Sequence, residues 1–185
     1  MFKYHQIASF VDEKGYVLDV GCGEGQLGHV LSLKGCLVDG LDINIDRLND
    51  RKKYYQNIFL MDIRSFEKKN SGYDYVVFSD MLEHVENPGE ILNSSLKLLS
   101  ANGKVIISLP NVGYFLNRLG LLFGNWNYTE EGILDNTHVR FFTLATAKKF
   151  IQLSGYHIRN IEAEVPVINA FWKRTVFTLL SRLWP

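Results

Sequence analysis

The sequence has little of several features that would assign a protein to a class at once. It contains two cysteines among 185 residues, and neither belongs to a CxxC pair or to a Cys/His spacing typical of zinc sites. It has no apolar run of about 18 residues, the length that a membrane-spanning helix needs. Twenty basic residues balance twenty acidic ones, so no global field favours a nucleic acid. With no signal peptide visible, we expect a soluble protein of the reducing cytoplasm.

Short apolar runs alternate with segments of helical spacing along most of the chain. The predicted strands are Tyr16–Val20, Cys36–Leu41, Ile58–Met61, Tyr73–Ser79, Lys104–Leu109 and Tyr156–Ala163. The predicted helices are 3–12, Gln26–Lys34, Ile45–Lys53, Pro88 to about Ser100, and Leu144–Ser154 with Thr143 as its N-cap. This alternation predicts an α/β fold with a doubly wound, mostly parallel sheet. Such sheets bind ligands at the carboxyl ends of their strands.

A glycine-rich segment, Val17–Gly28 (VLDVGCGEGQLG), joins the first predicted strand to the next helix. Glycines at 21, 23 and 25 allow a sharp turn and close approach of a ligand to the backbone. The helix behind them offers free N–H groups to an anion. Glycines 23, 25 and 28 also satisfy GxGxxG, the dinucleotide fingerprint. The loop alone is therefore consistent with a dinucleotide, with another adenosine ligand, or with a plain tight turn.

Three aspartates at successive strand ends separate these alternatives. Asp19 precedes the glycines, where an anion opposes a pyrophosphate but favours the ammonium and sulfonium of S-adenosylmethionine (SAM). Asp42 ends the second strand and can accept hydrogen bonds from both ribose hydroxyls, a feature that NAD-binding proteins share. Asp62 ends the third strand and can bind an adenine amino group, beside the Ile63 backbone; it can equally be a solvated turn residue.

Successive segments of the chain resemble the motifs of class I SAM-dependent methyltransferases. They are VLDVGCGEGQLG, GLDIN, MDI, YDYVVFSDMLEHVENP and GKVIISLPN, in order over roughly residues 15–112. The later DNTHVRFFT resembles a segment of the MetW-like and UbiG-like small-molecule enzymes. The resemblance implies a Rossmann-like sheet of seven strands with SAM as methyl donor. It implies cofactor contacts by Asp19, Gly21, Cys22, Gly23, Gly25, Gln26, Asp42, Ile43, Asp62, Ile63, Ser79 and Asp80.

Two polar clusters are candidates for the methyl acceptor side. His84 follows the fourth strand, and we expect it to be a base or acceptor contact if residues 81–85 form a short helical turn. His138 is a second candidate base, and Arg140 can pair with an acidic acceptor. Each has a structural alternative: backbone bonding for Glu83 and His84, and a capped turn with a salt bridge for the later pair. Tyr114, Phe115, Trp126 and Tyr128 form either a lid or ordinary core.

A metal site is a further alternative. Asp80, Glu83 and His84 have an acid-x-x-acid-His spacing that resembles sites in metal-dependent O-methyltransferases. Those families favour Glu at the first acid, whereas this chain has Asp. We therefore expect no metal, because methyl transfer from a sulfonium needs mainly positioning and exclusion of water.

The whole chain, 1–185, is interpreted as one domain, with a cofactor half at about 1–110 and an acceptor and C-terminal part at about 111–185. No seventh strand is visible, so the natural chain is expected to be longer. The apolar segment Val167–Trp184, with interspersed basic residues, suggests a helix that serves as a lid, a dimer contact or a lipid-surface contact.

The prediction is a SAM-dependent methyltransferase acting on an O, N or C atom of a small-molecule acceptor. Two other functions stay open. An NAD-dependent oxidoreductase fits the glycine pattern, but no Tyr-x-x-x-Lys pair follows the fifth strand. A SAM-binding module without turnover also fits the first half of the chain, although the second half retains polar candidates.

Overall fold

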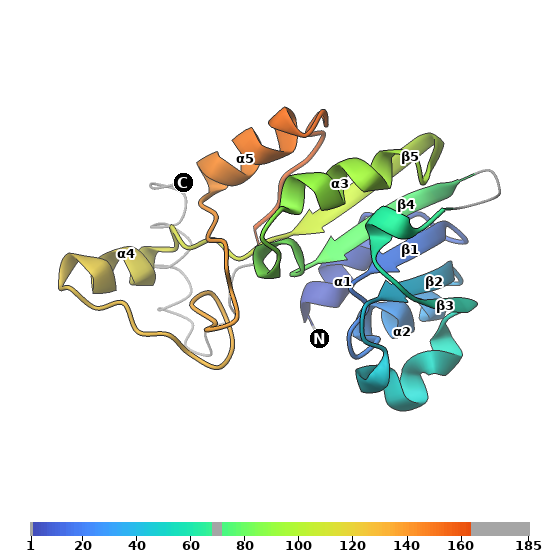
Figure 1. Ribbon diagram of the computed structural model, residues 1–185, viewed down its shortest axis with the longest axis horizontal. Coiled ribbons are helices and arrows are strands. Elements are labelled where there is room, and N and C mark those ends of the chain that lie inside the picture. Colours follow the sequence, from blue (N-terminus) through green and yellow to red (C-terminus); the bar gives the residue numbers. More distant parts are fainter. Residues whose placement is uncertain (1, 68–71, 164–185) are drawn as a thin grey trace. The chain divides into compact units, whose positions relative to one another are not determined.

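A computed structural model describes residues 2–67 and 72–163 of the chain, and the chain divides into two compact units between Leu109 and Pro110. The first unit contains a sheet of five parallel strands in the order β3-β2-β1-β4-β5 (Figure 1). The strands are β1 (Tyr16–Val20), β2 (Leu37–Asp42), β3 (Asn57–Leu60), β4 (Tyr73–Ser79) and β5 (Leu99–Ser108). The order reverses direction between β1 and β4, which is where doubly wound sheets bind ligands.

Helices cover both faces of this sheet because its central strands are apolar on both sides. The helices α1 (Phe2–Ser9) and α2 (Gln26–Leu33) pack on one face, and α3 (Pro88–Leu96) lies on the other (Figure 1). The core beneath α1 and α2 includes Val17 of β1 and Val77 of β4, both 0% exposed. The predicted α/β fold is confirmed for this unit.

Short 3-10 segments join the strands on the side of the glycine loop. They are η1 (Asp46–Tyr54), η2 (Ile63–Ser65) and η3 (Leu82–His84). The sequence predicts an α-helix at Ile45–Lys53, but η1 is kinked at Asn49, whose φ is 43° and ψ is −131°. Only Leu48 of η1 is buried, so packing supplies little to hold a regular α-helix there.

The α3–β5 region differs from the prediction in its boundaries. Helix α3 ends at Leu96 rather than near Ser100, and β5 already begins at Leu99. Tyr73 pairs with Leu99 and Tyr75 pairs with Lys104. A step of two residues along β4 therefore corresponds to a step of five residues along β5, and the extra residues of β5 are unpaired with β4. The predicted Asn102–Gly103 turn is therefore an irregularity inside β5 rather than its start.

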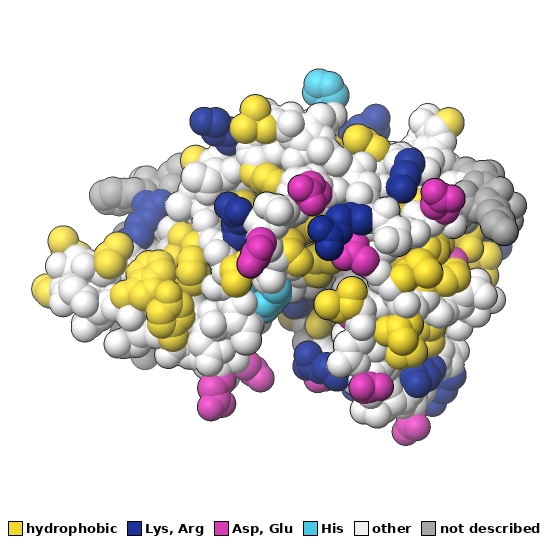
Figure 2. All heavy atoms as spheres, viewed as in Figure 1, with side chains coloured by type: hydrophobic (Ala, Val, Ile, Leu, Met, Phe, Trp, Pro, Cys, Tyr) yellow, Lys and Arg dark blue, Asp and Glu magenta, His cyan; other side chains and the backbone are white. Residues whose placement is uncertain are grey.

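The second unit, from Pro110, contains α4 (Phe115–Leu122), which the sequence did not predict, and α5 (Leu144–Leu153). Helix α5 begins where it was predicted, because Thr143 and Thr146 form a reciprocal capping box. No residue of α4 is buried. Figure 2 shows hydrophobic side chains on the surface over α4. The exposed apolar residues of this helix are Phe115, Leu116, Leu119, Leu121 and Leu122.

The predicted sixth strand, Tyr156–Ala163, is wrong: the structure has no strand there. Within the described ranges no strand pairs with this segment, and an extended chain without a partner leaves its backbone groups to water. The Ile161 N–H instead donates to Oδ1 of Asn160 at 2.9 Å. The predicted helix Val167–Trp184 lies outside the described residues. Among those that are described, no helix is long and apolar enough to cross a membrane.

Candidate functional site

The glycine loop lies where β1 ends and α2 begins. Glycines 21, 23 and 25 adopt φ values of 72°, 48° and 75°, and the Gly21 N–H donates to the Leu41 carbonyl of β2 at 2.8 Å. Inside the loop, the Gly25 N–H donates to the Cys22 carbonyl at 2.8 Å, and Gln26 begins α2. Burial of Cys22 raises the pKa of its thiol, so the thiol stays protonated. The loop is therefore held to its neighbour strand by its own backbone.

The three loop glycines face different surroundings. A Cβ atom on Gly21 would lie 2.7 Å from Cγ of Met81, and one on Gly25 would lie 2.9 Å from Cδ2 of Leu48. A Cβ on Gly23 would meet nothing closer than the Gly21 carbonyl oxygen at 3.8 Å. Gly21 and Gly25 are thus required by packing. The backbone at Gly23 faces open space, where a ligand can approach it closely.

Asp42 lies at the end of β2 and reaches this open part of the loop. Its Oδ2 accepts from the Gly23 N–H at 2.8 Å, and its Oδ1 accepts from the Asn44 N–H at 2.9 Å. A carboxylate has about four acceptor positions, so both oxygens keep capacity for further donors. Ile43, the next residue, is 76% exposed. Asp42 and Ile43 therefore present a carboxylate and an apolar side chain at consecutive positions.

Asp62, after β3, is bound differently. Arg64 donates to it from Nε at 2.9 Å and from Nη2 at 2.6 Å, and the Arg64 N–H also donates to Oδ1. These bonds lower the pKa of Asp62. The side chain of Ile63 is buried, whereas Leu60 and Met61 are exposed. An adenine amino group at Asp62 would therefore have to share the carboxylate with Arg64.

Ser79 and Asp80 follow β4. Asp80 has a φ of 48°, and its carboxylate binds Lys3 Nζ at 2.5 Å and the Ser108 hydroxyl. The Ser79 hydroxyl oxygen is buried and has no hydrogen-bond partner among the described residues. A buried hydroxyl without a partner costs free energy, so it suits a site that receives a polar ligand group.

Asp19 is the most buried acid of the loop region. It is 1% exposed, and its Oδ2 accepts from the Tyr55 hydroxyl at 2.8 Å. Burial raises the pKa of Asp19 to about 7; the Tyr55 hydrogen bond opposes this rise and the nearby Asp42 charge adds to it. The sequence predicts a fixed anion at this position. The structure instead gives an acid that titrates near neutral pH.

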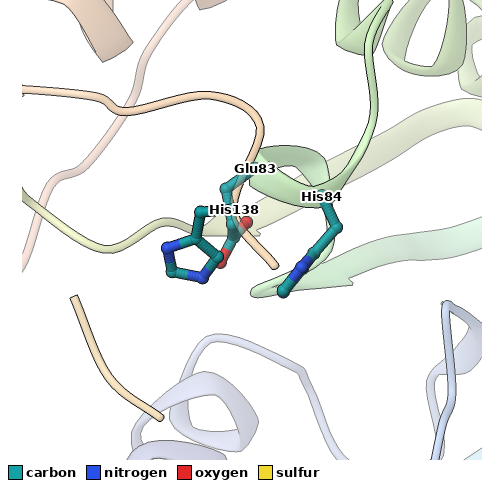
Figure 3. Close-up of side chains that lie close together, drawn as sticks. All are labelled: Glu83, His84 and His138. Carbon is teal, nitrogen blue, oxygen red and sulfur yellow. The ribbon is translucent and has the colours of Figure 1, made fainter. Parts of the chain in front are cut away.

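Glu83 and His84 leave the same short turn, η3, after β4 (Figure 3). The predicted helical turn at 81–85 is thus present as a 3-10 turn. Glu83 is 0% exposed and His84 is exposed. Within the described part of the first unit, Asp80, Glu83 and His84 do not converge as three metal ligands. The Asp80 carboxylate binds Lys3 and the Ser108 hydroxyl.

His138, which Figure 3 also labels, belongs to the second unit. Its Nδ1 lies 3.2 Å from the Ile133 carbonyl oxygen, which can only accept, so a neutral His138 carries its proton on Nδ1 and presents Nε2 as an acceptor. Arg140 is exposed. Phe141 makes ring contacts with Trp126, Tyr128 and His138 at centroid distances of 5.5, 6.4 and 6.0 Å. The predicted aromatic residues 126 and 128 thus form one cluster with His138.

Three contacts of the first unit were not predicted from the sequence: Tyr55 on Asp19, Lys3 on Asp80, and Met81 over Gly21. Each joins segments that are far apart in the chain. Tyr55 ends a charged stretch and follows no spacing rule, and Lys3 looks like an ordinary charge on a short helix. The sequence signal that could have indicated close packing here is Gly28, the third glycine of the GxGxxG pattern, because a glycine at that position allows close packing of the helix.

Comparison with models of protein families gives a match for this chain. The family described as Methyltransferase domain matches residues 3–161. The chain belongs to this family. The recognition made from its motifs is confirmed, and SAM is the cofactor of the domain.

Curated relatives of this methyltransferase domain include ubiquinone biosynthesis O-methyltransferases. The protein of that name from Coxiella burnetii (strain Dugway 5J108-111) is 29% identical over 102 residues, which cover 52% of this chain and 44% of the relative. The one from Psychrobacter arcticus is 31% identical over 104 residues, covering 51% and 40%. The match therefore spans less than half the length of these relatives.

Solved structures share the fold of the domain. A putative methyltransferase from Bacillus halodurans superposes with a TM-score of 0.64 at 18% identity, covering 86% of this chain and 69% of the other. A SAM-dependent methyltransferase from Archaeoglobus fulgidus gives a TM-score of 0.62 at 20% identity, covering 98% and 86%. At these identities the likeness concerns the fold alone.

The residues at the loop fit SAM. Gly23 leaves space beside the backbone, Asp42 has unused acceptor capacity, and the Ser79 hydroxyl has no described partner. Exposed apolar side chains are available for a purine at the ends of β2 and β3, and they are Ile43, Leu60 and Met61.

Proposed function

We propose that this domain transfers a methyl group from SAM to an O, N or C nucleophile of a small-molecule acceptor by in-line displacement. The observation that supports this most directly is the open backbone face at Gly23 with Asp42 bonded to it, at the switch point of the sheet. SAM bound there supplies an activated methyl group. The names of the curated relatives favour an oxygen acceptor.

Each residue of the first unit has a proposed role toward the cofactor. Asp42 accepts from the ribose hydroxyls with the acceptor positions that Gly23 and Asn44 leave unused. Asp19 stabilises the ammonium group, Ser79 donates to a polar group of the methionine end, and Asp80 lies toward the transferred methyl. Asp62, already bound by Arg64, takes the adenine amino group only as a shared partner.

The acceptor side rests on three side chains. We propose that His84 and His138 orient or deprotonate the acceptor and that Arg140 pairs with an acidic group on it. The support is chemical: His84 and Arg140 are exposed, and the Nδ1 contact of His138 leaves Nε2 as the basic nitrogen.

The two cysteines are both free thiols, which supports a cytoplasmic location.

Calorimetry with S-adenosylhomocysteine (SAH) tests the cofactor assignment. We expect SAH to bind and Asp42→Ala to weaken binding at least tenfold, because a buried polar ligand group then loses its acceptor. Asp46→Ala, which removes an exposed acid of η1, is the matched control and should bind SAH like the wild type. Tight NADH binding without SAH binding would contradict the proposal.

Turnover on a confirmed acceptor tests the acceptor side. His84→Ala and His138→Ala should each retain SAH binding and lose on the order of a hundredfold in kcat if they act as general bases. Full activity of both variants would remove the two histidines from the mechanism and leave the cofactor assignment unaffected.

A further inference from the structure

Tyr55, the residue after η1, lies in a slot between α2 and the sheet. A Cβ on Gly28 of α2 would lie 2.3 Å from Cζ of Tyr55, and a Cβ on Gly40 of β2 would lie 3.0 Å from its Cδ1. A Cβ on Gly25 would lie 3.2 Å from its Cε2. Tyr55 is 7% exposed. Glycine is thus present at three positions around the ring, and any side chain at 28 would displace it.

The slot aims the Tyr55 hydroxyl at the acid behind the glycine loop. The hydroxyl donates to Oδ2 of Asp19 at 2.8 Å, and Asp19 lies two residues before Gly21. Burial and the Asp19 charge raise the pKa of Tyr55 far above its usual range, so the phenol keeps its proton and remains a donor. Tyr55 therefore fixes one carboxylate oxygen of Asp19 at every physiological pH.

Among the described residues, no cation influences the ionisation of Asp19. In the sheet, β2 places Gly40 and β4 places Val77 beside it in register, and neither carries charge. The titratable groups that act on it are Tyr55 and Asp42, and the buried thiol of Cys22 lies close by. Burial and the Asp42 charge favour protonation, and the Tyr55 hydrogen bond favours the anion.

We propose that Tyr55 is a positioning residue of the cofactor site: its hydroxyl orients Asp19 and favours the ionised form of this acid, and so sets the pH range in which SAM and SAH bind. This inference rests on the proposed function. An ionised Asp19 attracts the ammonium group of either ligand and the sulfonium of SAM. A protonated Asp19 loses that attraction, so affinity falls as the pH is lowered through about 7.

The test is SAH affinity measured by calorimetry from pH 5.5 to pH 9 for the wild type, Tyr55→Phe and Tyr73→Phe. Tyr73 also donates from a buried phenol to a buried aspartate of the same sheet, Asp39, at 2.8 Å, so its variant is the matched control. The ionisation of SAH itself is common to all three proteins and cancels in the comparison.

Tyr55→Phe is expected to move the pH midpoint of SAH affinity upward by about one pH unit, because one hydrogen bond to the anion is lost. Binding then weakens by about fivefold at pH 7 and hardly at all at pH 9. Tyr73→Phe keeps the wild-type midpoint. An equal loss at every pH for Tyr55→Phe, or the same shift in both variants, overturns the inference. Absence of SAH binding by the wild type instead overturns the proposed function.

A wild-type measurement keeps the inference testable if Tyr55→Phe does not fold. At pH 7 an acid that titrates near 7 is about half protonated, so binding of SAH should release about half a proton. The heat of SAH binding in two buffers of different ionisation enthalpy measures this number. A value of zero contradicts the proposed role of Asp19, and with it that of Tyr55.

Discussion

Two aspartates of neighbouring strands, Asp19 of β1 and Asp39 of β2, are each 1% exposed, yet their surroundings differ. Asp39 accepts hydrogen bonds from three donors: Tyr16 at 2.6 Å, Tyr73 at 2.8 Å and Asn57 at 2.9 Å. Asp19 accepts from Tyr55 alone within the described part of the chain. Asp39 joins its own strand, β2, to three others, whereas Asp19 lies behind the glycine loop. The same residue at the same burial therefore supports the fold in one place and is suited to a ligand in the other.

The largest effect in this comparison is expected for Asp39→Ala. The change leaves the buried Tyr73 phenol and two less buried donors, Tyr16 and Asn57, without an acceptor, so the free energy of unfolding should fall by about 4 kcal/mol. Urea unfolding measures it. The pH midpoint of SAH binding should stay at its wild-type value, because Asp39 is not part of the loop region. A shifted midpoint would show that the two acids are coupled.

Gly28→Ala should lower the free energy of unfolding by about 3 kcal/mol, since the added methyl group overlaps the Tyr55 ring. Gly120→Ala in α4 is the matched control, because it is also a helical glycine but its nearest contact would be at 3.5 Å. There the better helix propensity of alanine should leave stability unchanged or raise it by up to about 1 kcal/mol. Equal losses in thermal unfolding of the two variants would argue against a Tyr55 slot.

The pH dependence of stability provides the third test. The pKa of Asp19 is raised on folding, so its contribution is fully present below about pH 4 and is lost as the pH rises through about 7. Between pH 5 and pH 8 the wild type should lose on the order of 2 kcal/mol from this group. Asp19→Asn should remove that slope. A parallel slope in the variant would assign the pH dependence to other groups.

The smallest stability effect is expected for Gly23→Ala. A non-glycine residue at a φ of 48° costs about 1 kcal/mol, and the added Cβ meets no atom closer than 3.8 Å. SAH affinity should nevertheless fall more than tenfold, because the methyl group fills the space that the ligand needs. If the variant binds SAH with wild-type affinity, the ligand does not bind against Gly23.

The sequence predicted the parallel sheet and the position of its loop because both depend on local signals. Tyr16–Val20 and Tyr73–Ser79 are short apolar runs bounded by polar or glycine residues, and both strands are found at those bounds. The sixth strand failed because a strand at 156–163 requires a pairing partner, which a local alternation of residues does not report. Helix α4 was missed because residues 113–140 are rich in glycine, asparagine and aromatic residues, a composition that indicates loops rather than a helix.

Within the site, the sequence predicted which acids end the strands but not what each acid contacts. Asp42 bonds to the loop backbone, as a ligand-binding acid can. Arg64 on Asp62 and Lys3 on Asp80 are side-chain pairings between flexible residues, for which no spacing rule exists. The ionisation of Asp19 depends on burial, which is a property of the packed structure rather than of the sequence.

The Tyr55 slot also constrains how related sequences can diverge. Positions 28, 40 and 55 share one volume, so a change at one of them is tolerated only together with changes at the others. A relative with a short side chain at 55 is free to have alanine at 28 and 40, and it loses the phenol donor to the acid at 19. Joint substitution at these three positions would therefore identify relatives whose cofactor sites work over a different range of acidity.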